Sequence, residues 1–186
     1  MATLKPPRRL FAFLRAINVG GRNVAMAELR RVFESLGLRD VETFIASGNV
    51  VFTSGGQDIR ALELLVEDGL RKALGYEVTT FIRNEEELAA IAKCEPFRKS
   101  HLQDAAALNV GFLAAPPGPA AKKLIAGFRS EVDDFHVRGR EVYWLSRTKQ
   151  SDSKFNNVRF EKMLNTRATW RGINTIRRLA AKFALV

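Results

Sequence analysis

The chain of 186 residues contains one cysteine, Cys94, and two histidines, His101 and His136. A single cysteine excludes an intramolecular disulfide and is compatible with a reducing compartment. One thiol and two imidazoles are too few for the common structural zinc sites, which are built from thiolates and imidazoles. We therefore expect no bound metal.

Long apolar runs are also missing. No stretch approaches the roughly 20 apolar residues that a membrane-spanning helix needs. Arg15 and Asn18 interrupt the apolar run that follows the basic start of the chain, and no small-residue cleavage site comes after it. A secretory signal is therefore not indicated. We expect a cytoplasmic protein with no membrane partner.

Acidic residues are too few to balance the basic ones. The chain has 30 Lys and Arg against 20 Asp and Glu, which gives a formal net charge of +10. Such a charge attracts nucleic acid, anionic metabolites or acidic partners, and it does not fix specificity. The alternative is an arginine-rich composition whose basic surface has no binding role. The sequence leaves both interpretations open.

The first half of the chain, residues 8–83, predicts the element order strand, helix, strand, strand, helix, strand. Apolar residues at helical spacing predict two helices, one ending at Gly37 and the other near Gly75. Short β-rich segments predict four strands, at residues 9–16, 41–46, 50–53 and 77–82. This order is that of the ferredoxin-like unit.

The second half, residues 84–186, echoes the first. A bridging helix over residues 85–93 leads to the predicted order strand, helix, strand, strand, helix, with one further helix at the end. Strands are expected at residues 108–113, 135–137 and 141–145. The fold class is therefore α+β, with two ferredoxin-like halves that form antiparallel sheets with helices.

The first strand is apolar on both sides, because Phe11 and Phe13 alternate with small and branched apolar residues. Either the rest of the chain covers the second side, or nucleic acid stacks on exposed rings, as in an RNA-recognition sheet. Residues 48–52 lack the paired aromatics and leading basic residue of that module, which favours burial.

Two motifs follow apolar strands: Leu-Arg-Ala-Ile-Asn-Val-Gly-Gly-Arg-Asn over residues 14–23, and Ser-Gly-Asn over residues 47–49. In the ferredoxin-like topology both lie at the same end of the sheet. The adjacent glycines of the first motif can turn consecutive N–H groups inward as an anion-binding nest, beside the positive end of the next helix. Arginine and amide side chains add donors. The candidate ligand-binding residues are Arg15, Asn18, Gly20, Gly21, Arg22, Asn23, Ser47, Gly48 and Asn49.

The same residues have a structural alternative, in which the glycines shape the loop and the asparagines satisfy backbone groups. No Walker pattern and no G-x-G-x-x-G is present, so no nucleotide cofactor is indicated. Ser153 stands beside Lys154, but a serine before a helix is more typical of an N-cap, and we expect Ser151, Asp152 or Ser153 to cap the next helix.

These two motifs resemble the bacterial family catalogued as domain of unknown function 1697, and the resemblance extends through residues 168–175. That segment is similar to the family's A-T-T-R-N-W-N-T, with matches at Ala168, Thr169, Arg171, Asn174 and Thr175 and differences at Trp170, Gly172 and Ile173. The resemblance implies a compact, cytosolic α+β protein and no agreed activity. Arg171 joins the candidate ligand-binding residues, whereas Thr169, Asn174 and Thr175 are expected to serve as caps and loop contacts ahead of the final helix.

Three functions remain open. The first is a binding protein for an anionic ligand, with nucleic acid as the leading partner. The second is an enzyme acting on a small phosphorylated or carboxylated metabolite in the same place. The third is a structural or protein-interaction module. The sequence indicates neither a catalytic residue nor an oligomeric state.

Overall fold

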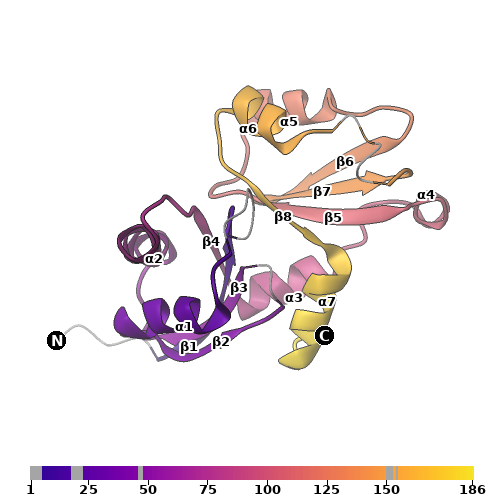
Figure 1. The fold of residues 1–186 in the computed structure, drawn as a ribbon. Helices are drawn as coiled ribbons and strands as arrows, with labels where there is room; N and C mark the ends of the chain where they lie inside the picture. Colours follow the sequence, from indigo (N-terminus) through magenta and orange to yellow (C-terminus); the bar gives the residue numbers. More distant parts are fainter. Residues whose placement is uncertain (1–5, 18–22, 46–47, 150–152, 154) are drawn as a thin grey trace. The chain divides into compact units, whose positions relative to one another are not determined.

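A computed structural model describes residues 6–17, 23–45, 48–149, 153 and 155–186. The chain folds as two compact units (Figure 1). The first covers Met1–Ala89 and Leu185, and the second covers Ala90–Ala184 and Val186. This division falls inside the helix α3 (Glu85–Lys93). The boundary that the sequence places after residue 83 stays a prediction.

The first unit has the ferredoxin-like order, as predicted. Its four strands form one antiparallel sheet in the order β2-β3-β1-β4, with the two central strands β1 and β3 paired to each other. In chain order, its elements are β1 (Arg8–Leu14), α1 (Met26–Ser35), β2 (Arg39–Thr43), β3 (Asn49–Ser54), α2 (Ile59–Leu74) and β4 (Thr80–Asn84).

The core of this unit lies between the two helices and one face of the sheet. Helix α1 contributes Leu29 and Phe33, and α2 contributes Leu62 and Val66. These side chains pack against alternate residues of β1, and each fully buried side chain contributes about 1.5–3 kcal/mol. On the other face of β1 lie Phe11 and Phe13, which are also fully buried.

The edge strand β4 is protected by carboxylates. Three of its backbone N–H groups, at alternate residues, donate to glutamate side chains of the helices α2 and α3. These bonds, each 2.9 Å long, join Thr80 to Glu67, Ile82 to Glu63 and Asn84 to Glu87. An edge strand whose N–H groups are occupied does not offer them to another chain.

The second unit repeats the topology of the first. Its sheet has the order β6-β7-β5-β8, which equals the first order with every strand number raised by four. A short helix, α4 (Lys99–Gln103), precedes the repeat. The repeat itself contains β5 (Ala107–Phe112), α5 (Pro119–Ala126), β6 (Asp133–Arg138), β7 (Glu141–Ser146), α6 (Asn157–Leu164), β8 (Thr169–Gly172) and α7 (Ile173–Lys182). The two ferredoxin-like halves are therefore present, each followed directly by one more helix.

Strand β8 differs from the sequence prediction, which gave the second half only three strands and expected Thr169 to serve as a cap or loop contact. Only four residues long, β8 shows no clear apolar alternation of its own. Its strand conformation comes from antiparallel pairing with β5, in which Val110 faces Arg171 and Asn109 faces Gly172.

The core of the second unit is aromatic. Helices α5 and α6 pack on one face of its sheet, and the rings of Trp144, Phe155, Phe160 and Trp170 lie 4.5–6.0 Å apart from centroid to centroid in successive contacts. Such separations are typical of favourable ring pairs. Within the described part of the chain, no helix combines the length and apolar character needed to cross a membrane.

Candidate functional site

The end of β1 and the turn before β3 are in direct contact. The N–H of Leu14 donates to the carbonyl oxygen of Gly48 at 2.8 Å. Gly48 has a positive φ of 70°, and a Cβ added there would lie 3.2 Å from the Cβ of Leu14 and 3.3 Å from that of Ile17. The two motif-bearing segments therefore meet at one end of the sheet, and only glycine fits their contact without strain.

Asn49 has a structural role in this contact. Its side chain is 1% exposed, and its Nδ2 donates to the carbonyl oxygen of Phe44 at 2.9 Å. The N–H of Phe44 donates in turn to the carbonyl oxygen of Asn49 at 2.9 Å. The Asn49 amide thus closes the turn between β2 and β3, in line with the structural alternative for this residue.

The backbone is strained on both sides of the contact. Ala16 and Ile45 have φ values of 59° and 56°, in the left-handed region that side chains with a Cβ disfavour. The strain is most unusual for Ile45, which is β-branched and 43% exposed. Strained residues persist where the surrounding structure fixes them, and they gather at ligand sites.

Of the remaining candidate residues at this end of the sheet, the structure describes Arg15 and Asn23. Asn18, Gly20, Gly21, Arg22 and Ser47 lie outside the described residues, so their anion-binding nest stays a prediction. Arg15 is partly buried, and its N–H donates to the carbonyl oxygen of Thr79 at 2.9 Å. Asn23 is exposed.

Arg171 belongs to β8 in the second unit. Its Nη1 donates to Thr169 Oγ1 at 2.9 Å and to the carbonyl oxygen of Trp170 at 2.8 Å. Burial lowers the pKa of its guanidinium to about 10, so the side chain still carries its charge at neutral pH. Whether Arg171 shares a ligand with the N-terminal motifs stays a prediction.

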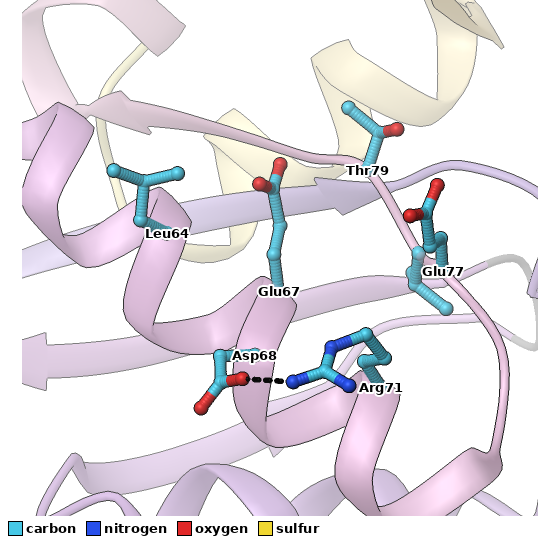
Figure 2. A pocket seen from close by; sticks show the side chains of 7 residues that line it. Leu64, Glu67, Asp68, Arg71, Glu77 and Thr79 are labelled. Atoms are coloured by element: carbon cyan, nitrogen blue, oxygen red, sulfur yellow. Dashed lines mark hydrogen bonds and ion pairs between the residues drawn. The ribbon is translucent and has the colours of Figure 1, made fainter.

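A hollow of about 310 Å³ lies in the first unit beside α2 (Figure 2). Its lining includes Glu67, Asp68 and Glu77, whose charge disfavours an anion. Asp68 is paired with both Arg71 and Lys72 at 2.6 Å, and their hydrogen bonds lower its pKa. Glu67 accepts the N–H of Thr80. No group of three metal-ligating side chains is found among the described residues.

Ser153 does not cap the following helix, contrary to the prediction, and Ser151 and Asp152, the other two residues that it named, lie outside the described residues. The N-cap is Asn156, whose side chain accepts the N–H groups of Val158 and Arg159. The Ser153 Oγ lies 2.9 Å from both carboxylate oxygens of Asp133, which is buried. The Asp133 carboxylate also accepts the indole N–H of Trp144, at 2.8 Å from Nε1. These contacts hold a loop against the core.

A second hollow, of about 470 Å³, lies in the second unit where β5 meets the start of α7. Sequence reasoning missed it. Asn109 was not singled out, and Asn174 and Thr175 were assigned to caps and loop contacts, yet all three line this hollow. The signal that identifies it is a helix start without a capping side chain, which becomes visible only once β8 is recognised.

The comparisons with known proteins agree with this fold. Residues 8–143 match the family model described as protein of unknown function, DUF1697. Among solved structures, the chain is similar to the conserved bacterial protein SP0830 from Streptococcus pneumoniae. The two are 24% identical with a TM-score of 0.68, over 94% of this chain and 98% of the other. That likeness shows the fold alone, and no curated protein matches the chain. Since the family model spans most of the sequence, the chain belongs to the DUF1697 family of proteins of unknown function.

Proposed function

We propose that the protein binds an anionic ligand at the end of the first sheet, and that nucleic acid is the leading candidate for this ligand. The observation that carries the proposal is the contact of Leu14 and Ile17 with Gly48, which joins the two motif-bearing segments. The left-handed backbone of Ala16 and Ile45 on either side supports it, because such strain gathers at ligand sites.

The charge of the chain favours nucleic acid over other anions. A formal net charge of +10 strengthens the binding of polyanions at low salt. The rings of Phe11 and Phe13 are buried, so base stacking on this strand does not contribute. The proposal therefore relies on phosphate contacts, from Arg15 and from the Gly20–Arg22 part of the loop. It places the protein in the cytoplasm, where nucleic acid is available.

Two arginine variants test the location of the site. Arg15→Ala removes the positive charge of the residue that follows Leu14 in the chain. Arg39→Ala removes an exposed one at the start of β2, which is in register with Thr53 near the other end of β3. Both variants lose one positive charge. We expect Arg15→Ala to weaken the binding of labelled single-stranded RNA several-fold more than Arg39→Ala does, as measured by fluorescence anisotropy.

Equal losses for the two variants would contradict the proposed location, because they would show that only total charge matters. If the full chain binds no RNA but is stabilised by one small phosphorylated or carboxylated compound, nucleic acid is the wrong ligand. An enzyme acting on that compound then becomes the better hypothesis.

A further inference from the structure

We propose that the second unit holds a separate binding site for a small organic anion, in the hollow between β5 and the N-terminus of α7. The hollow has a volume of about 470 Å³, within the range of small-molecule sites. Every residue that lines it belongs to the second unit. The inference does not rest on the function proposed for the first unit.

The first component of the site is the start of α7. The lining includes the N-cap Gly172 and the first three helical residues, Ile173, Asn174 and Thr175. The first N–H groups of an α-helix have no partner within the helix, and together they form its positive end. No side chain of the described residues caps α7, and its first turn contains no acidic residue. These N–H groups are therefore available to donate hydrogen bonds to an anion.

Helix α3 of the first repeat shows how the same position is normally closed. Like α7, it begins directly after the last strand of its sheet. There Asn84 Oδ1 accepts the N–H of Glu87 at 2.8 Å, and Glu87 Oε2 accepts the N–H of Asn84 at 2.9 Å. This reciprocal pair is a capping box. In the second repeat Gly172 stands where Asn84 stands in the first, so the cap is missing.

The second, independent component is Asn109. It faces Gly172 in the pairing of β5 with β8, and it also lines the hollow. The residue is 9% exposed, and its Nδ2 is buried without a hydrogen-bond partner among the described residues. A buried amide nitrogen in this state is unfavourable unless something accepts its hydrogens. An anionic oxygen at the start of α7 would supply the acceptor.

The charge and shape of the lining define the class of ligand. Among the described residues, Arg177 is the charged residue of the lining, and none of the lining residues is acidic. The Arg177 Nε donates to the carbonyl oxygen of Ala92 at 3.3 Å, which positions the guanidinium. The rest of the lining is largely apolar and includes Leu102, Leu108 and Ile173. The site therefore fits a phosphate or carboxylate group attached to a small apolar body.

The test is a titration of the full chain with phenyl phosphate and with benzoate, followed by NMR of backbone amides. We expect saturable shifts centred on the N–H groups of Asn174 and Thr175 with at least one of the two compounds, and the stronger binder identifies the headgroup. Benzyl alcohol, which has a similar ring but no charge, is expected to cause no such shifts. If neither anion moves these amides, or if the alcohol moves them equally, the proposal is wrong.

A matched pair of arginine variants tests the role of Arg177. Arg177→Ala is expected to lower the affinity for the anion about tenfold, because a charge-assisted hydrogen bond is lost. Arg178→Ala changes the net charge equally on the same helix, but Arg178 does not line the hollow, and we expect unchanged affinity. An equal loss of affinity in the two variants would overturn the assignment of Arg177 to the site.

The variant Gly172→Asp tests the site without loss of the fold. Gly172 has φ −59° and ψ 137°, close to the −62° and 139° of Asp58, whose side chain accepts two N–H groups at the start of α2. An aspartate at the start of α7 is expected to occupy the same N–H groups as the ligand. We expect an unchanged or higher Tm and no anion binding. Retained affinity in the folded variant would contradict the site.

Discussion

The N–H of Leu14 lies 2.8 Å from the carbonyl oxygen of Gly48, and this bond ties the end of the first strand to the turn between β2 and β3. The same contact supports the fold and unites the motifs of the proposed ligand site. Substitutions here must therefore be divided into those that break the turn and those that change the charge beside it. Gly48 and Asn49 belong to the first group, and Arg15 to the second.

We expect Gly48→Ala to lower the free energy of unfolding by about 2 kcal/mol. The new Cβ would require a left-handed conformation and would press on the side chains of Leu14 and Ile17. Gly55→Ala is the control, because a Cβ there meets nothing within 4 Å. It is expected to change stability by less than about 0.5 kcal/mol. Urea denaturation measures both, and equal stabilities would show that the turn tolerates a side chain.

We expect Asn49→Ala to be destabilising by about 1–3 kcal/mol, because it leaves the carbonyl oxygen of Phe44 without the Asn49 amide. The measurement is again urea denaturation, at neutral pH. Because the loss comes from the fold, any weaker RNA binding by this variant must be measured where it remains folded. A variant as stable as the parent protein would mean that the Asn49 amide does not hold the turn.

The sequence predicts most of the fold because the helices carry clear apolar stripes. Leu62, Val66 and Leu70 recur on one side of α2 and are all buried. The strand β8 is not predictable in this way, since Trp170 faces an aromatic core while Arg171 lies on the other side, and pairing with β5 decides its structure. The N-cap Asn156 was missed because Ser151, Asp152 and Ser153, which also suit an N-cap, come earlier in the same segment.

The candidate site was predictable only in part. The convergence of the two segments at Gly48 follows from the order of the strands, which fixes which strand ends lie together. The buried Asn109 Nδ2, which has no partner within the described part of the chain, could not be predicted, because its surroundings depend on the neighbours that folding places around it. For the same reason the sequence does not identify Gly172 as the N-cap of a helix.

Glu67 should give the stability of the chain a pH dependence. Burial raises its pKa above the ordinary value of 4.5, although the N–H of Thr80 opposes this shift. An acid whose pKa is raised by folding binds more protons in the folded state. The contribution of Glu67 to the free energy of unfolding is therefore complete below pH 4.5. It is lost as pH rises through the pKa that Glu67 has in the folded state.

We expect Glu67→Gln to reduce the decline of the free energy of unfolding as pH rises. The variant should be at least as stable as the parent protein at neutral pH, because its amide oxygen can still accept the N–H of Thr80. Glu67→Ala removes the acceptor and should cost about 1–3 kcal/mol. Urea denaturation at several pH values compares the three proteins. A glutamine variant with an unchanged pH profile would show that Glu67 does not cause the decline.

The variant Asn109→Leu should raise the free energy of unfolding by about 1 kcal/mol. It replaces an amide whose nitrogen has no hydrogen-bond partner among the described residues with an apolar side chain of similar size. Thermal and urea denaturation both measure the change. A loss of stability greater than about 1 kcal/mol would indicate that the Asn109 amide has a favourable partner, and would remove one of the two components of the second site.

The most direct test of the account is the salt dependence of single-stranded RNA binding by the full chain, measured by fluorescence anisotropy between about 50 and 200 mM salt. Phosphate contacts predict that the logarithm of the affinity falls linearly with the logarithm of salt concentration, by about 0.7 for each phosphate neutralised. We expect such a slope, and a shallower one for Arg15→Ala. The absence of binding even at the lowest salt would contradict a nucleic-acid ligand and leave the charge of +10 without a binding role.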